Sequence, residues 1–345
     1  MVVFVSVACD LDALAVELQR SFGPIPVVGS TTAGEISPTG YSRGTAVGFS
    51  LAAPDFAAAV IPIYDLRSFT VAAGEVAMSE GLRLLRHQVP HASLQQLFGI
   101  LLIDGLSLCE EAVASALRSA MGEIPMCGGS AGDSMRFERT LLLHDGTWHS
   151  GAALLTLVAT PLPFHVFKNE HFIPGDERMV VTGADVSRRI VTEINGYPAV
   201  REYARMVGLA GAPLTPMVFA QHPVVVRIGG SNYVRSIQKA NDDESLSFYC
   251  AIDEGVVLRL AHGVDPVDDL GRLFADLRKE VGPPALTVGF DCILRSLEMD
   301  RKGIRDRIGS LMAANNVIGF ASYGEQFEGM HVNQTFTGVA IGRPG

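Results

Sequence analysis

The sequence predicts an α/β fold of two domains, with mixed sheets built from repeated βαβ units and a β-rich middle segment. The main observation is a pattern that occurs three times: an apolar strand, an amphipathic helix and a second apolar strand. Each second strand ends in a glycine turn closed by an acidic residue. The second observation is length, because 345 residues are too many for one ordinary domain and favour two.

The first copy of the pattern runs from the strand at 2–5 to the turn at 29–35, and its helix follows Asp10, a suitable N-cap. The second runs from 99–104 to 128–133, and its helix is expected to start at a capping box formed by Ser107 and Glu110. The third runs from 286–290 to 319–325. Helices that join short apolar strands predict right-handed crossovers and parallel pairing. Antiparallel strands are expected after the copies, at 45–50, 152–158 and 333–340.

The middle of the chain has a different pattern and predicts short antiparallel strands. One hairpin is expected from 224–228 and 233–237 around Gly229-Gly230, and another from 246–252 and 256–260. We group this middle segment with the third βαβ unit. The predicted domains are therefore residues 1–160 and 164–345, with a boundary at the proline-rich residues 161–163.

Composition excludes several classes of protein. A net charge of −10, with no stripe of lysine and arginine, argues against nucleic-acid binding. The longest apolar stretch, 152–161, is too short to span a bilayer, so no membrane partner is expected. Five widely spaced cysteines without a CxxC pair are typical of reduced thiols. Together these features predict a cytoplasmic protein.

No sequence motif of a common enzyme class is present. The chain has no P-loop, dinucleotide-binding fingerprint, zinc-protease motif or nucleophile elbow. The acids that end the turns, Glu35, Asp133 and Glu325, are expected to accept hydrogen bonds from neighbouring turn amides rather than to catalyse proton transfer. An enzyme that uses Cys292 or the paired acids is the weakest of the alternatives. We therefore predict a protein without enzymatic activity.

The histidines offer a candidate cofactor site. None of the nine has zinc-ligand spacing, but a single imidazole in an apolar pocket suffices as an axial haem ligand. His222, then His171, are the chosen candidates because each borders a strand among apolar residues. His222 is the predicted metal ligand. Arg227 and Arg235 lie on the adjacent hairpin, where a guanidinium suits a ligand carboxylate, although solvation of a sheet edge is the alternative.

Several segments resemble the signatures of FIST proteins, which pair an N-terminal and a C-terminal FIST domain and act as bacterial sensory input modules. The segments that carry this resemblance are 29–36, 128–133, 194–199, 233–237 and 319–325. FIST relatives usually carry a further segment before the first strand. The resemblance therefore implies that the N-terminal domain here lacks its first element.

Further segments are similar to those of FIST proteins of the NosP type, which bind haem and sense nitric oxide. They are 166–172, 222–237, 248–255, 291–295 and 331–335. This resemblance implies a haem b cofactor, a response to nitric oxide, and a partner that is a histidine kinase or a cyclic-di-GMP enzyme. It does not identify the ligand histidine.

The alternative is a FIST sensory module that binds a small metabolite, such as an amino acid, without haem. In this interpretation the glycine turns and Arg235 would hold the charged ends of the ligand. Homo-oligomerisation is compatible with both interpretations and stays open.

Overall fold

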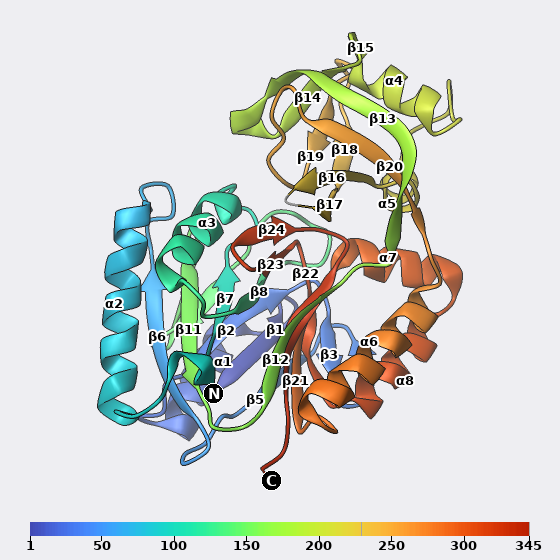
Figure 1. The fold of residues 1–345 in the computed structure, drawn as a ribbon. Coiled ribbons are helices and arrows are strands. Elements are labelled where there is room, and N and C mark those ends of the chain that lie inside the picture. Colours follow the sequence, from blue (N-terminus) through green and yellow to red (C-terminus); the bar gives the residue numbers. More distant parts are fainter. Residues whose placement is uncertain (229, 345) are drawn as a thin grey trace.

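The computed structural model describes residues 1–228 and 230–344, which form a broad body with a smaller lobe above it (Figure 1). Three mixed sheets build the body, and helices cover their outer faces. The lobe extends from the start of β13 (Phe172–Asp185) to the end of β20 (Val257–Gly263). It is thus inserted between β12 (Phe164–Asn169) and α6 (Pro266–Val281) of the body. The predicted α/β class with mixed sheets is confirmed.

Three βαβ units form the centres of the three body sheets, as the sequence predicts. In each unit the two strands pair in parallel, and helices connect them. Asp10 caps the first helix, because its carboxylate accepts the N–H of Ala13 at 3.0 Å. The units are β1–α1–β2 (Val2–Ser6, Leu11–Phe22, Val28–Thr32), β7–α3–β8 (Leu97–Ile103, Glu110–Met121, Met126–Ser130) and β21–α7–α8–β22 (Leu286–Cys292, Ile293–Lys302, Arg305–Ala314, Val317–Ser322).

Each unit is extended by the antiparallel strand expected after it. Strand β5 (Ala46–Phe49) pairs with β1, β11 (Ala153–Ala159) with β7, and β25 (Phe336–Ile341) with β21. Strand β11 also pairs with β6 (Ala57–Ile63), which α2 (Val71–Gln88) covers on the outside. On the other side of the body, β12 pairs with β25 and leads the chain up to the lobe.

The hairpin that follows each βαβ unit joins the sheet of another unit. The first unit's hairpin pairs with β22 of the third, the third's with β8 of the second, and the second's with β2 of the first. The three units therefore exchange hairpins in a closed cycle, and none completes its sheet alone. The hairpins are β3–β4 (Glu35–Ser37, Gly40–Ser42), β23–β24 (Glu325–Phe327, Met330–Val332) and β9–β10 (Leu142–His144, Thr147–His149).

This exchange joins the third unit to the first two. The sequence pattern groups the third unit with the middle segment, whereas in the structure Gly319 of β22 pairs with Ile36 of β3. Hydrophobic periodicity identifies strands but carries no information about which hairpin edge they meet. The domain boundary at residues 161–163 stays a prediction.

The lobe packs two helices and an antiparallel sheet around an apolar core of its own. The hairpin predicted from 224–228 and 233–237 is present, with Val224 opposite Arg235, while Gly229 of its turn lies outside the described residues. The hairpin predicted from 246–252 and 256–260 is wrong, because β19 pairs with β14 and β18, and β20 with β13 and β16. The remaining lobe elements are β14 (Ile190–Ile194), β15 (Tyr197–Pro198), α4 (Ala199–Met206), α5 (Pro216–Gln221), β16 (Val224–Ile228), β17 (Ser231–Arg235), β18 (Ile237–Ala240) and β19 (Leu246–Phe248).

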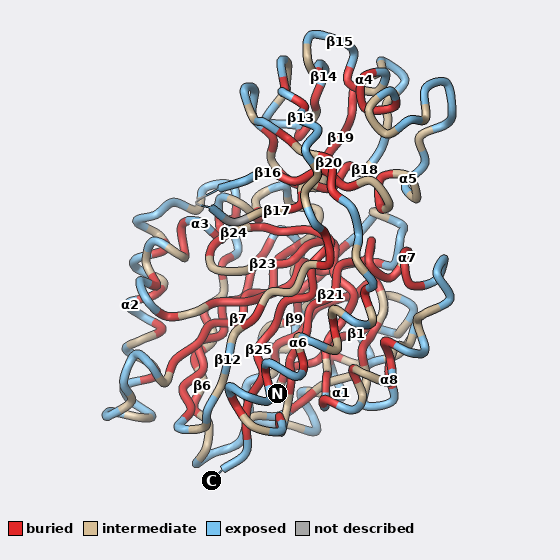
Figure 2. Tube along the Cα trace, turned by 45° about the vertical axis from the view of Figure 1, so that its right-hand side comes forward, coloured by how far each residue is buried: buried red, intermediate tan, exposed pale blue. Residues whose placement is uncertain are grey.

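Aromatic rings from the first and third units meet in the centre of the body, where the strands are buried (Figure 2). The ring centroid of Phe4 lies 4.8 Å from that of Phe320 and 6.2 Å from that of Phe290. All three rings are fully buried. Glycines also let the two strands that carry Phe290 and Phe320 lie close together. A Cβ on Gly319 would lie 1.7 Å from the carbonyl oxygen of Gly289 on the neighbouring strand.

Replacing Gly319 by alanine tests this packing. We expect Gly319→Ala to lower the free energy of unfolding by about 1–3 kcal/mol or more, because the methyl group forces two paired strands apart. The matched control is Gly271→Ala in α6, where the added methyl group meets no atom within 4 Å. This control should raise stability by about 0.5–1 kcal/mol through better helix propensity. Urea unfolding curves measure both, and equal stabilities of the two variants would contradict the packing argument.

Candidate functional site

The acids that close the glycine turns are hydrogen-bond acceptors, in agreement with the structural interpretation. Glu35 and Glu325 are fully buried. Each accepts from a hydroxyl three residues before it and from a threonine hydroxyl ten residues after it. Asp133 accepts three backbone N–H groups of residues 137–139 at 2.8–2.9 Å. These carboxylates hold the turns in shape and have their oxygens occupied.

The structure places the four predicted site residues in four different surroundings. His222 follows α5, is half-buried, and its backbone carbonyl accepts the hydroxyl of Tyr203 at 2.7 Å. Arg227 is exposed on β16. Arg235 reaches down from β17 to the body, where Nη1 donates to the carbonyl of His331 at 3.2 Å. His171, the fourth, lies at the base of the lobe.

His171 is buried where the chain enters the lobe. The neck, residues 169–172 and 262–265, contains both connections between lobe and body, and the His171 carbonyl joins them by accepting the N–H of Val264 at 2.8 Å. The ring is 1 % exposed, and both its nitrogens are engaged. Nδ1 faces Nη1 of Arg295 at 2.8 Å, and Nε2 faces the Glu298 carboxylate at 2.7 Å. The sequence places His171 among apolar residues, whereas its ring contacts Arg295 and Glu298, which lie more than 120 residues away.

This network favours a neutral imidazole. Burial lowers the pKa of His171 and Arg295 lowers it further, which outweighs the opposite effect of Glu298. The Arg295 guanidinium can only donate, so Nδ1 accepts and the ring proton resides on Nε2, which donates to Glu298. Burial alone would raise the pKa of Glu298, but the hydrogen bonds from His171 and Lys302 hold it at about 2.

The network continues from the neck into the exchanged hairpins. Nε of Arg295 donates to Oδ1 of the fully buried Asp291 at 2.6 Å. The other carboxylate oxygen accepts the hydroxyl of Tyr41, on the first unit's hairpin, at 2.6 Å. A single chain of buried hydrogen bonds therefore connects the base of the lobe with the first and third units.

A buried arginine of the lobe contacts the second unit. Arg189 is 5 % exposed, and its Nη2 donates to Glu110 at 2.7 Å and to Glu111 at 2.5 Å. The predicted capping box is wrong: α3 begins at Glu110, and this carboxylate pairs with the lobe rather than with its own helix. Glu111 also accepts the N–H of Ala251 of the lobe at 2.7 Å. No local sequence signal marks Arg189, because its partners are about 80 residues away.

A cavity of about 550 Å³ lies beside this ion pair, between lobe and body. Its body side is formed by loops that follow β7, β8 and β22, so it lies at the carboxyl ends of parallel strands, where α/β folds bind ligands. Its lobe side is formed by β14, β18, β19 and their turns. His171, His222, Arg227 and Arg235 do not line it. The lining residues are Gly105, Leu106, Leu108, Glu110, Phe137, Arg188, Arg189, Ile190, Gln238, Lys239, Asn241, Asp243, Ser247, Phe248, Tyr249 and Tyr323.

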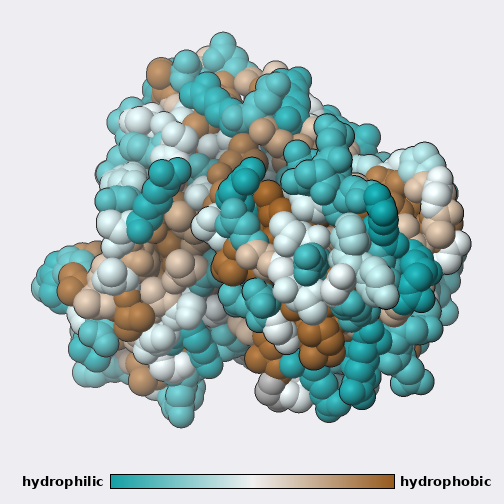
Figure 3. All heavy atoms as spheres, turned by 90° about the horizontal axis from the view of Figure 1, so that it is seen from above, coloured by the Kyte–Doolittle hydropathy of each residue, from teal (hydrophilic) through white to brown (hydrophobic). Residues whose placement is uncertain are grey.

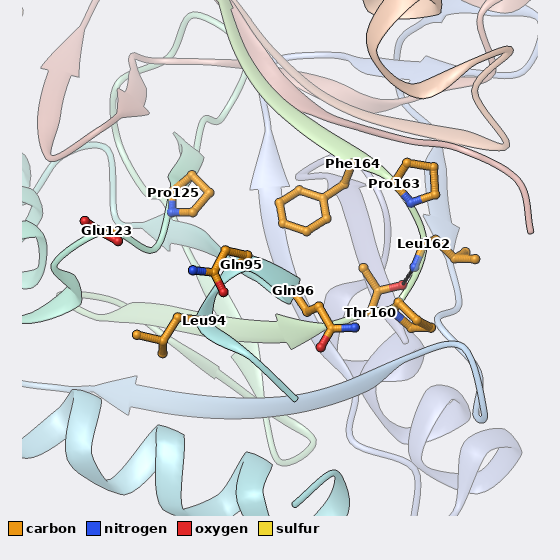
Figure 4. A pocket seen from close by; sticks show the side chains of 10 residues that line it. Leu94, Gln95, Gln96, Glu123, Pro125, Thr160, Leu162, Pro163 and Phe164 are labelled. Atoms are coloured by element: carbon orange, nitrogen blue, oxygen red, sulfur yellow. Dashed lines mark hydrogen bonds between the residues drawn. The ribbon is translucent and has the colours of Figure 1, made fainter. Parts of the chain in front are cut away.

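A second cavity, of about 470 Å³, lies at the opposite ends of the strands (Figure 4). Leu94, Pro125 and Phe164 surround it, and Glu123 is its charged residue. This cavity belongs to the body alone and has no lobe residue in its lining. The interlobe cavity is the better candidate site, because it combines charged groups with the strand ends. Figure 3 looks down on the lobe and shows hydrophilic side chains interspersed with hydrophobic patches.

The comparisons with known proteins identify the family. The model of the FIST N domain matches residues 1–197, and the model of the FIST C domain matches residues 199–328. The chain belongs to the FIST family. The FIST protein is therefore a sensory module of signal transduction, and its two matched regions meet within the lobe. A search of the curated proteins found no match.

The described residues give little support to a metal site, a membrane-spanning helix or a reactive cysteine. Among them, no three His, Cys, Asp or Glu side chains group to hold a metal ion, and no helix combines the length and apolarity needed to cross a membrane. Burial raises the pKa of Cys292 well above its usual value, so the side chain is a thiol. A reactive cysteine needs the opposite shift.

We expect acid pH to weaken the neck through His171. Its folded pKa lies below the unfolded value of about 6.5, so the unfolded state binds the proton first, and stability falls as pH drops below about 6.5. His171→Gln cannot titrate and should lose less stability than the wild type between pH 7.5 and 5.5. Urea unfolding at both pH values measures this difference. The control His87→Gln, at an exposed histidine of α2, should keep the wild-type slope; a wild-type slope in His171→Gln would contradict the assignment.

Two adjacent arginines allow a matched test of the interlobe ion pair. Arg189→Met leaves Glu110 buried without its partner and should lower the free energy of unfolding by about 3–5 kcal/mol. Arg188→Met should change it by less than about 1 kcal/mol, because Arg188 is exposed and lies 4.0 Å from Asp185. Urea unfolding and hydrogen exchange at the base of the lobe measure the two effects. Similar losses in both variants would show that the pair does not join lobe and body.

Proposed function

We propose that this FIST protein senses a small polar metabolite, such as an amino acid, in the interlobe cavity. The observation that supports this most is the composition of its wall: strand-end loops of the body on one side and lobe strands on the other. A volume of about 550 Å³ lies within the range of small-molecule sites. Charged and aromatic side chains both line it, which suits a polar ligand with an apolar part.

A ligand in this cavity would contact lobe and body together. Its binding would therefore favour one relative position of the two, and the polar contacts of Arg189, Arg235 and His171 are of the kind that permits such movement. A partner that distinguishes the two positions receives the signal, and coupling of about 1–3 kcal/mol is typical. We propose a histidine kinase or a cyclic-di-GMP enzyme as that partner, on the strength of the family resemblance.

Haem binding with a response to nitric oxide is the second candidate. The surroundings of His171 do not fit an axial ligand, because both ring nitrogens are hydrogen-bonded in a buried network. His222 fits better: its ring makes no hydrogen bond to the described residues, and burial lowers its pKa, which favours the neutral imidazole that binds metals. When bound, haem b would supply the iron that binds nitric oxide.

Absorption spectra separate the two candidates. We expect protein produced with a haem precursor to purify colourless and to take up no stoichiometric hemin, because His222 lines neither of the two cavities described above. The spectrum should be recorded oxidised, reduced, and reduced with nitric oxide. A stoichiometric Soret band that shifts with the gas and disappears in His222→Ala, but persists in the control His87→Ala on the exposed face of α2, would establish the haem sensor instead.

Thermal unfolding in the presence of metabolite pools tests the metabolite sensor. A pool containing the ligand should raise the melting temperature, because about 100 times Kd stabilises the folded state by about 2.7 kcal/mol. Leu106→Trp fills the interlobe cavity and should abolish the shift. The control Leu94→Trp places the same side chain in the second cavity and should keep it. A shift that survives Leu106→Trp, or no shift with any pool of amino acids and organic acids, would contradict the proposal.

A further inference from the structure

Three aromatic rings form one continuous wall of the interlobe cavity. Phe137 stacks on Tyr323, with 4.6 Å between ring centroids and 26° between ring planes. The centroid of Tyr249, from the lobe, lies 6.2 Å from that of Phe137. The wall therefore combines body and lobe residues and offers ring faces and edges to a ligand.

The body part of this wall is held in place by hydrogen bonds. The Tyr323 hydroxyl donates to Asp133 and lies 3.0 Å from the carbonyl of Ser134, so this residue presents its ring rather than its hydroxyl to the cavity. Asp133 also accepts the N–H of Phe137 at 2.9 Å. One buried carboxylate thus positions both stacked rings before a ligand arrives, which reduces the ordering that binding requires.

The lobe side of the cavity supplies positive charge. Arg189 is neutralised by Glu110 and Glu111, and Arg188 forms a longer ion pair with Asp185 at 4.0 Å, whereas Lys239 has no ion pair among the described residues. The acid on this side, Asp243, accepts the N–H and the hydroxyl of Ser245 at 3.1 and 2.6 Å. The cavity thus combines aromatic surface with an unpaired lysine and a weakly paired arginine, a combination that is complementary to one class of molecule.

We propose that the interlobe cavity selects a planar aromatic molecule that carries an anionic group, its ring against Phe137 and Tyr249 and its acid toward Lys239 and Arg188. Aromatic pairs in offset or edge-to-face geometry contribute about 0.5–1.5 kcal/mol beyond their buried area. Charge-assisted hydrogen bonds to the acid fix the orientation of the ring. This inference rests on the proposed metabolite sensor and names the class of its ligand.

Calorimetric titration of the full chain with three matched probes tests the inference. The probes are 2-naphthoate, its saturated analogue decahydro-2-naphthoate, and 2-naphthylmethylamine. We expect 2-naphthoate to bind at least tenfold more tightly than either of the others, because each lacks one of the two features. Leu106→Trp should abolish its binding and Leu94→Trp should not.

Two further variants assign the contacts. Lys239→Gln should weaken 2-naphthoate about fivefold or more, whereas Lys279→Gln, at an exposed lysine of α6, should leave it unchanged. Tyr249→Leu should narrow the preference for the aromatic over the saturated acid. The Tyr249→Leu variant changes a partly buried ring and is at risk of not folding. In that case the surface variant Lys239→Gln alone tests the predicted contacts.

The failures of the inference and of the proposed function are distinguishable. Equal binding of the aromatic and saturated acids, or tighter binding of the amine, overturns the inference. If none of the probes binds but a metabolite pool raises the melting temperature of the wild type and not of Leu106→Trp, the cavity is a sensor site for another ligand class. If neither probes nor pools act through the cavity, both proposals fail.

Discussion

The exchange of hairpins among the three βαβ units is the constraint on which the rest of the structure depends. Each unit provides a parallel pair and lends its hairpin to the sheet of another, so the three sheets close around one aromatic core. The buried acids Glu35 and Glu325 anchor the bases of two exchanged hairpins through the same pair of hydroxyl contacts. The pattern that repeats in the sequence is thus the part of each unit that connects it to another unit. The glycine turns, which resemble ligand sites, belong to these connections.

Against this rigid body, the lobe is attached by contacts of a different kind. Its own core is apolar and separate, and it meets the body both through the polar contacts of Arg189, Arg235 and His171 and through packing of α5 on α7. Polar interfaces of this kind resemble transient protein–protein interfaces, which permit relative movement of the parts that they join. The hydrogen-bond chain from His171 through Arg295 and Asp291 to Tyr41 connects the base of the lobe with the interlocked sheets.

Local patterns in the sequence predicted the local structure well. The three parallel pairs, the Asp10 cap and the hairpin at 224–235 follow from periodicity and turn residues, and the family follows from the turns themselves. Pairings between residues far apart in the chain could not be predicted from the sequence. The sequence predicts that Glu110 caps its own helix, whereas its partner is Arg189 of the lobe. It also predicts a hairpin from the strands at 246–248 and 257–263, although other strands lie between them in the sheet. The cavity is likewise assembled from segments far apart in the chain, and although two of them, 248–255 and 319–325, carry family signatures, nothing in the sequence shows that they meet.

The closed cycle of hairpins also sets an order of events during synthesis. Strand β3 leaves the ribosome early, yet its partner β22 follows only after the entire lobe has been made. Until then β3 presents an unpaired edge, and the central rings of Phe4 and Phe98 lack the rings of Phe290 and Phe320. Unpaired edges and uncovered apolar surface are the features that chaperones recognise in nascent chains. The strands of the lobe are consecutive in the sequence. The lobe can therefore complete its own sheet while the first two units still lack the strands of the third.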